Sequence, residues 1–248
     1  MKNLTETLHH IPGTRREYVA FSGANATTPY LFDTQQKYQR KLFASVDEVL
    51  DRCDLHDGMT VSFHHAFREG DKVINYVMDK LAQRGLKGLT LASSSLMSCN
   101  TPLIGHIRNG VIGKIYTSGM RGELADAISH GLMDEPVQIH SHGGRVNLIQ
   151  KGEITIDIAF LAVSCCDEYG NASGNGGTSQ CGSLGYAMVD AQYAKKVVLL
   201  TETLKPFPNL PASIVQDRVD YVVQIESVGD PAKISVGAAR VTDRKSVV

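Results

Sequence analysis

The 248-residue sequence has no apolar run long enough to cross a bilayer, and its N-terminus, MKNLTETLHH, lacks the apolar core of a signal peptide. Its five cysteines are odd in number and form no CxxC pair. This pattern argues against a disulfide framework and against a structural zinc site. We therefore expect a cytoplasmic protein with no membrane span and no metal.

The sequence also has no large excess of charge of either sign, because it contains 25 basic and 26 acidic residues. A net charge of -1 gives no electrostatic reason to expect nucleic acid or an anionic membrane as the main partner. There is no tryptophan, no low-complexity segment and no repeat at solenoid periods. Hydrophobic residues make up 42% of the chain, which is enough to build a proper core.

Residues 1–34 carry turn signals that break any periodicity, and we interpret them as an N-terminal arm lying over a domain or a partner subunit. Residues 35–248 form the expected domain. It begins with an amphipathic helix over 35–53, in which Ser45 or Asp47 starts a second part.

Short apolar runs then alternate with helical patterns. We expect strands at 59–63, 89–92, 114–117, 137–140, 154–163, 197–201 and 221–225, the run at 154–163 being a longer strand or a hairpin. Helices are expected at 71–84, 102–108, 122–129 and 187–194. This alternation predicts an α/β fold with an open, mostly parallel sheet and helices on both faces.

The stretch from Val137 to Glu202 carries nine glycines between Gly143 and Gly185, in polar turns that follow apolar runs. Open α/β sheets bind ligands at the carboxyl ends of their strands, so these turns are candidate ligand contacts. Glu202 ends the run VVLLTE and is either such a contact or a surface residue.

The turn SFHHAFREGD follows the first strand of this α/β pattern. Its side chains His64, His65 and Arg68 suit a carboxylate, because a guanidinium binds one in bidentate fashion and imidazoles add directed donors. The alternative is a solvated loop with a stacked Phe67. The serines Ser93, Ser94 and Ser95 precede a helix and suit an anion, although ordinary helix capping nearby by Ser98 or Asn100 explains such residues equally well.

The segment HSHGGR, residues 140–145, places two glycines after a strand. Gly143 and Gly144 are candidate oxyanion donors, and Arg145 is a candidate phosphate contact. His140 and His142 share a strand face, but no third ligand stands at a convincing spacing for a metal.

Two further features favour no particular chemistry by themselves. The loop GNASGNGG, residues 170–177, fits neither a dinucleotide fingerprint nor a P-loop. Cys165 and Cys166 are better explained by buried packing than by nucleophilic chemistry, since nothing around them would lower a thiol pKa.

Several long motifs in the same order resemble the alpha subunits of citrate lyase, which are citrate CoA-transferases of the CoA-transferase superfamily. The similarity extends from about residue 35 to about residue 240. It is carried by DGMTVSFHHAFREGD, by SSSLMSCNTPLIGHIRNGVIGKIYTSGMRGELADAISHG, by HSHGGR and by DEYGNASGNGG with CGSLGYAMVDAQYA. Other CoA-transferases carry a Gly-rich loop where this chain has two histidines and an arginine.

The resemblance implies a CoA-transferase-like fold and an acyl exchange, in which an acetyl thioester and citrate give a citryl thioester and acetate. The thioester belongs to the CoA-like arm of an acyl-carrier (gamma) subunit, and free CoA thioesters can replace it. A lyase (beta) subunit then cleaves the product. The family exchanges the acyl group through a mixed anhydride, and an oligomer without a tightly bound cofactor is expected.

The resemblance also assigns roles to the candidate residues. His64, His65 and Arg68 would hold citrate carboxylates, Gly143 and Gly144 would stabilise an oxyanion, and Arg145 would contact a carboxylate or phosphate. The groove for the CoA-like arm would be lined by Ser93, Ser94, Ser95, Asn171, Gly174, Gly176 and Gly177.

Members of that family are about twice as long, with two similar domains around a cleft, and this sequence matches the first. A truncated product, an isolated domain and one half of a split enzyme all fit this length. Two other hypotheses remain open from the residues. One is a non-catalytic module that binds CoA-like thioesters or assembles with lyase partners. The other is a sugar-phosphate isomerase or deaminase of similar fold, which leaves the long motifs unexplained.

Overall fold

A computed structural model describes residues 39–234, so the expected arm at 1–34 lies outside the described residues. Its centre is an eight-stranded sheet in the order β1-β10-β9-β6-β2-β3-β4-β5, and every neighbouring pair of strands is parallel. The strands are β1 Leu42–Phe43, β2 Thr60–Phe63, β3 Leu89–Ser93, β4 Ile112–Thr117, β5 Gln138–Ile139, β6 Ile158–Ala162, β9 Lys196–Thr201 and β10 Tyr221–Gln224. The α/β class and the parallel sheet predicted from the sequence are confirmed.

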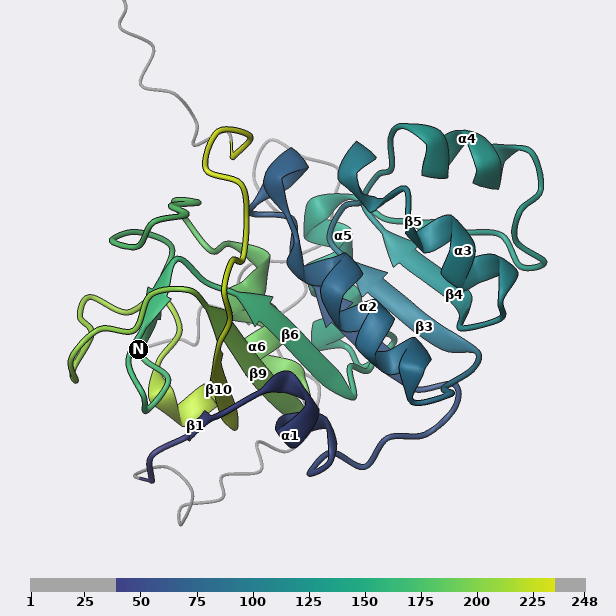
Figure 1. Ribbon diagram of the computed structural model, residues 1–248. Helices are drawn as coiled ribbons and strands as arrows, with labels where there is room; N and C mark the ends of the chain where they lie inside the picture. Colours follow the sequence, from purple (N-terminus) through teal and green to yellow (C-terminus); the bar gives the residue numbers. More distant parts are fainter. Residues whose placement is uncertain (1–38, 235–248) are drawn as a thin grey trace, which may run out of the picture. The chain divides into compact units, whose positions relative to one another are not determined.

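Helices cover both faces of this sheet (Figure 1). On one face lie α1 Val46–Leu50, α2 Val73–Gln83, α3 Leu103–Arg108 and α4 Glu123–Ser129; on the other lie α5 His142–Gln150 and α6 Tyr186–Tyr193. The chain runs outward from β2 through β3 and β4 to β5, then returns to β6 on the other side of β2. Because parallel crossovers are right-handed, this change of direction moves the later helices to the opposite face.

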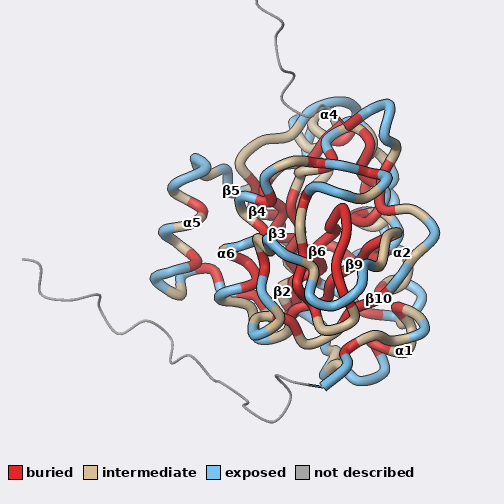
Figure 2. Tube along the Cα trace, turned by 90° about the vertical axis from the view of Figure 1, so that its left-hand side faces the viewer, coloured by how far each residue is buried: buried red, intermediate tan, exposed pale blue. Residues whose placement is uncertain are grey.

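The buried strands lie between these two helical layers (Figure 2). All five residues of β6 are buried, and the rings of Phe63 and Phe160 stack with their centroids 5.7 Å apart. A parallel strand covered on both faces needs apolar residues at every position, which explains why these strands appear in the sequence as unbroken apolar runs.

The amphipathic pattern at 35–53 does not form one helix. Leu42 and Phe43 form β1, which pairs with Val222 and Val223 of β10, and only Val46–Leu50 is helical. The helix begins where Ser45 accepts a hydrogen bond from the Glu48 N–H at 3.1 Å. Pairing with a strand far along the chain therefore overrides the local helical periodicity, while the expected start at Ser45 is confirmed.

Helix α5 was not expected from the sequence. The predicted strand at 137–140 is only β5, and the chain turns directly into α5, where Ser141 caps the helix by accepting from the Gly144 N–H at 3.0 Å. Two glycines in the first turn disfavour a helix by local propensity, so the sequence pattern did not predict α5. The run at 154–163 also shortens to the five-residue β6.

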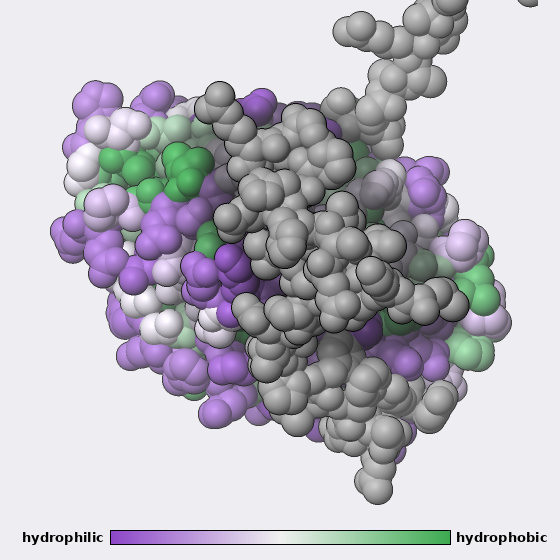
Figure 3. All heavy atoms as spheres, turned by 180° about the vertical axis from the view of Figure 1, so that it is seen from behind, coloured by the Kyte–Doolittle hydropathy of each residue, from purple (hydrophilic) through white to green (hydrophobic). Residues whose placement is uncertain are grey.

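β5 forms one edge of the sheet, and both of its residues are exposed. Ile139 is 61% exposed, and apolar atoms gather at the end of the domain that carries α4 and β5 (Figure 3). A two-residue edge offers few unpaired backbone groups for association with another strand. Within residues 39–234, no helix is both long and apolar enough to cross a membrane.

Candidate functional site

The chain changes direction between β2 and β6, and such a point in a parallel sheet leaves a crevice beyond the carboxyl ends of the two strands. His64 and His65 follow β2, and Ser164 lies just beyond β6. Ser93 is the last residue of β3, the strand that pairs with β2, and Ser94 and Ser95 follow it. Several of the predicted site residues are therefore brought to the same edge of the sheet.

His64 is bonded inside the protein, between the ends of β2 and β6. Its side chain is buried, Nδ1 accepts a hydrogen bond from the Ala66 N–H at 3.2 Å, and Nε2 lies 2.7 Å from the Ala162 carbonyl oxygen at the end of β6. Because Nδ1 accepts, the proton is on Nε2 and is donated to Ala162. Burial lowers the pKa of His64. Both ring nitrogens are occupied, in contrast to the expected contact of His64 with a carboxylate.

His65 points to a different environment. It is half-buried, its Nδ1 lies 2.7 Å from the Ser94 hydroxyl oxygen, and its ring centroid lies 5.7 Å from that of His142 and 6.0 Å from that of Tyr186. The ring centroids of His142 and Tyr186 are 4.9 Å apart. Burial lowers the pKa of His65 to about 4, so the imidazole is neutral at pH 7. We call His65, His142 and Tyr186 the ring cluster.

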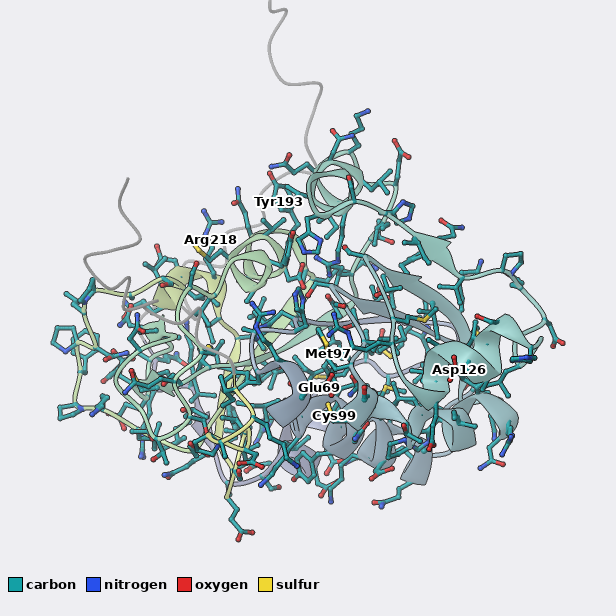
Figure 4. The ribbon with its side chains drawn as sticks, turned by 90° about the horizontal axis from the view of Figure 1, so that it is seen from above. Glu69, Met97, Cys99, Asp126, Tyr193 and Arg218 are labelled. Atoms are coloured by element: carbon teal, nitrogen blue, oxygen red, sulfur yellow. The ribbon has the colours of Figure 1, made fainter. Side chains whose placement is uncertain are left out.

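Arg68 begins the short 3-10 helix η2, Arg68–Gly70, and it is exposed. Its φ of 50° is the one positive φ of a non-glycine residue between 39 and 234. Residues held in such a conformation concentrate at functional sites. Glu69 fixes the turn, because its carboxylate accepts from the Cys99 N–H at 3.3 Å, and Glu69, Met97 and Cys99 lie together in Figure 4.

Arg145 does not reach the surface. The guanidinium is 1% exposed, and it donates to both carboxylate oxygens of Asp190, at 2.7 and 3.0 Å. It also donates to the Ser62 hydroxyl at 2.9 Å, and Ser62 in turn donates to Asp190 at 2.7 Å. The expected contact of Arg145 with a phosphate or carboxylate is therefore corrected: this side chain ties α5 to α6 and to β2 beneath the ring cluster.

The two glycines of α5 differ in what their N–H groups do. The Gly144 N–H already donates to Ser141. Gly143 is exposed in the first turn, where helix N–H groups lack intrahelical acceptors. The Gly144 N–H is therefore engaged within the protein, and Gly143 stays a predicted oxyanion donor.

The three serines at the end of β3 are engaged within the protein. Ser93 donates to the Ser95 carbonyl at 2.9 Å, and Ser95 donates to the Gly119 carbonyl at 3.1 Å. The Ser94 hydroxyl accepts from the His65 N–H at 3.0 Å. Their hydroxyls therefore shape the turn around His65, which the sequence pattern did not show.

The Gly-rich loop 170–177 packs closely on the end of β6. Asn171 is buried and bonds to Asp167 and Gln216, so its amide is structural. A side chain on Gly177 would overlap the Ser164 carbonyl, and the Gly177 N–H donates to the Ser164 hydroxyl at 3.1 Å. Gly176 has a φ of 92°, a conformation that favours glycine. The backbone of the loop is thereby held close to Ser164, just beyond β6.

Substituting Gly174→Ala should destabilise the fold by about 2–3 kcal/mol, because the new methyl group would overlap the Gly182 carbonyl oxygen. Gly143→Ala is the matched control, since a methyl group there meets nothing within 4 Å and the site is helical. The control should be neutral or stabilising by up to about 1 kcal/mol. Urea denaturation of both variants measures these changes, and equal stabilities would contradict the packing described for the loop.

Three other groups near this edge are accounted for. Glu202 is not a plain surface residue, because its Oε2 accepts from the Val228 N–H at 3.2 Å and its Oε1 is buried. Cys165 and Cys166 are buried, and burial raises the pKa of both thiols, which agrees with packing rather than with nucleophilic chemistry. No group of three histidine, cysteine or acidic side chains within residues 39–234 is arranged to hold a metal ion.

Asp71 gives the fold a testable pH dependence. It is buried, Oδ1 accepts from the Ile74 N–H at 3.0 Å, and Oδ2 has no partner among the described residues. Burial raises the pKa of this carboxyl from 3.8 to about 7. The folded state then holds the proton more tightly than the unfolded state, so this group's contribution to stability falls as pH rises from about 4 to about 7.

Asp71→Asn removes that titration and keeps an acceptor for Ile74. Relative to wild type, the variant should gain about 2–3 kcal/mol of unfolding free energy between pH 5 and pH 8. Burial lowers the pKa of His64 and His65, so their contribution to stability falls as pH falls, opposite to that of Asp71. Both histidines are present in wild type and in the variant, so their effect cancels in the comparison. Urea denaturation of both proteins across this pH range is the test. A difference in unfolding free energy between variant and wild type that does not change with pH would contradict the prediction.

The sequence did not predict two important residues. Tyr186 belongs to the ring cluster and Asp190 holds Arg145, yet both stand in a helix that reads as ordinary packing. Tyr186 and Asp190 are four residues apart, which puts both on one face of α6. That spacing would have indicated Asp190 only if Arg145 had been expected to need a buried acidic partner.

Comparison with known proteins identifies the family. The family model for the citrate lyase alpha subunit (CitF) matches residues 39–247. The citrate lyase alpha chain of Klebsiella pneumoniae is 60% identical over 222 residues, covering 90% of this chain and 44% of that protein. The chain therefore spans less than half the length of this relative.

Solved structures support the same assignment. A structure described as the citrate lyase alpha subunit of Streptococcus mutans in complex with citrate is 50% identical, with a TM-score of 0.79, and the match covers 84% of this chain and 41% of that one. An acyl-CoA transferase of Escherichia coli O157:H7 is 16% identical, with a TM-score of 0.60 over 86% of this chain and 50% of that one, and it shows the CoA-transferase-like fold alone. The chain belongs to the citrate lyase alpha subunit family.

Proposed function

We propose that this chain carries the citrate-binding half of a citrate CoA-transferase, which exchanges acyl groups on a CoA-type thioester. The observation that supports this most is the ring cluster at the β2–β6 crevice, together with family membership. In the Streptococcus mutans relative the bound molecule is citrate, and we extend that ligand to this chain.

The carboxylate contacts that we propose are His65 and Arg68, with His142 as a third donor at the same edge. His65 offers a neutral N–H and Arg68 a permanent positive charge, so the pair combines a directed hydrogen bond with charge attraction. His142 is exposed at the start of α5, where helix N–H groups also favour an anion. His64 is left out because both of its ring nitrogens are bonded inside the protein. Arg145 is left out because its guanidinium is 1% exposed and both of its terminal nitrogens donate to Asp190.

The reaction that we propose needs no protein nucleophile. A citrate carboxylate attacks the thioester carbonyl, a tetrahedral oxyanion forms, and collapse releases the thiolate and leaves an acetyl–citryl anhydride. The thiolate then attacks the citryl carbonyl, giving the citryl thioester and acetate. The Gly143 N–H and the His65 N–H are the donors proposed for the oxyanion, and such donors are typically worth ~10²–10³ in rate.

The thioester arm is proposed to lie along loop 170–177. Gly174, Gly176 and Gly177 carry no side chains and let the backbone of the loop pack closely on its neighbours. An extended arm can therefore approach the loop without meeting side chains at these positions. The CoA-type thioester is a substrate in this proposal. The proposed partners are an acyl-carrier subunit, which brings the arm, and a lyase subunit, which cleaves the product.

Citrate-dependent release of acetate from acetyl-CoA tests the proposal. We expect release when the chain is combined with the remaining segment of a full-length relative. Release by the chain alone would mean that residues 1–248 hold a complete site, and no release in either case would contradict the transferase function.

A second candidate is a non-catalytic module of the same family that binds CoA-type thioesters. Acetyl-CoA binding without turnover, even with the remaining segment present, would support the module instead.

A further inference from the structure

We infer that Ser94 is a positioning residue that holds His65 in the neutral tautomer with its proton on Nε2, so that this N–H is presented to the substrate carboxylate or thioester carbonyl. The inference deepens the proposed function and rests on it for the identity of the acceptor. It replaces the role in thioester binding that the sequence suggested for Ser94.

The hydrogen bonds around Ser94 fix the direction of each donor. The His65 backbone N–H donates to the Ser94 hydroxyl oxygen at 3.0 Å, and the same oxygen lies 2.7 Å from Nδ1 of the His65 ring. The first bond makes the oxygen an acceptor. Its own hydrogen then remains to be placed, and Nδ1 is the acceptor within reach.

The opposite arrangement leaves a buried donor without an acceptor. If Nδ1 carried the proton, the Ser94 oxygen would accept twice and its hydrogen would need another acceptor. Ser94 is fully buried, and its hydroxyl makes no other hydrogen bond with residues 39–234. A buried hydroxyl without an acceptor is strongly disfavoured, so Nδ1 accepts and the proton is on Nε2.

The surroundings of His65 also keep it neutral. An imidazolium would carry a proton on Nδ1 as well, and the Ser94 hydroxyl hydrogen would then have no acceptor. Burial lowers the pKa of His65 to about 4, and His64, His142, Arg68 and Arg145 add like charge around the ring when they are protonated. The imidazole therefore acts as a neutral donor at any pH near 7.

The neutral donor is aimed by the packing of the ring. Nδ1 is held by Ser94, while no residue from 39 to 234 bonds to Nε2 of His65. Tyr186 and His142 flank the ring with centroids 6.0 and 5.7 Å away, which limits its rotation. A neutral imidazole with a fixed tautomer can polarise a carbonyl or hold an oxyanion without changing its protonation state.

The test is ¹⁵N NMR of the histidine rings in the 1–248 chain, with His65→Gln used to assign the His65 signals. Wild type should show the Nε2–H pattern for His65 between pH 6 and pH 8. In Ser94→Ala the pattern should become a mixture of both tautomers, and in Ser94→Thr, which keeps the hydroxyl, it should return. A protonated Nδ1 in wild type, or an unchanged pattern in Ser94→Ala, would overturn the inference.

Citrate titration of the same samples separates the two claims. Citrate should shift the Nε2 resonance, and Ser94→Ala should weaken citrate binding roughly five- to tenfold, with Ser94→Thr close to wild type. If the wild-type and Ser94→Ala tautomers are as expected but citrate has no effect, the role of Ser94 stands and the proposed function fails.

Discussion

Arg145→Met should lower the free energy of unfolding by about 3–5 kcal/mol, because it leaves the Asp190 carboxylate buried without its partner. Both side chains are at most 1% exposed, and the pair joins α5, α6 and β2 through Ser62. Denaturation in urea at pH 7 measures the loss. Arg108→Met is the control, since Arg108 is exposed in the last turn of α3, and that change should stay within about 0.5 kcal/mol.

The double variant Arg145→Met with Asp190→Leu separates the buried charge from the contacts themselves. Removing both charges eliminates the uncompensated carboxylate, so the double variant should be more stable than Arg145→Met alone. If Arg145→Met cost no more than its surface control, the buried network would not be what holds the ring cluster together.

His65→Gln should reduce citrate-dependent acyl transfer by ~10²–10³, the loss expected when one donor to a developing oxyanion is no longer held in position. Glutamine keeps a hydrogen-bond donor but not the ring that Ser94, His142 and Tyr186 hold in place. The rate of acetate release from acetyl-CoA, measured with the remaining segment of a relative present, gives the effect.

The control for this substitution is His130→Gln. His130 is an exposed residue at the end of α4, with its ring nitrogen 2.7 Å from the carbonyl oxygen of Asp126 in its own helix. It should leave the rate unchanged. A rate for His65→Gln equal to that of the control would remove His65 from the mechanism.

The sheet was predictable because its strands are covered on both faces. Such strands must be apolar throughout, and the intervening helices must be amphipathic, so both patterns are written locally in the sequence. β1 and α5 were not predictable in the same way. β1 depends on Val222 and Val223 far along the chain. α5 has two glycines in its first turn, and their low propensity is outweighed by the Ser141 cap and the Arg145–Asp190 pair.

The site was only partly predictable for a related reason. The pattern HH before Arg68 indicated carboxylate binding, but it could not show that His64 faces β6 while His65 faces Ser94. Adjacent residues leaving a strand point in opposite directions, and the tertiary partners decide which one meets solvent. Arg145 was assigned to a ligand because it follows the two glycines of HSHGGR, and the pattern did not show that its partner is Asp190 on another helix.

The central claim is that a citrate carboxylate itself attacks the thioester at the β2–β6 crevice. Its most direct test is a single turnover with acetyl-CoA and citrate labelled with ¹⁸O in its carboxylates, using the chain combined with the remaining segment of a relative. Attack by citrate and collapse of the anhydride predict acetate that carries one ¹⁸O atom in the first turnover. Unlabelled acetate would place an enzyme carboxylate or water between the two substrates and would contradict the account.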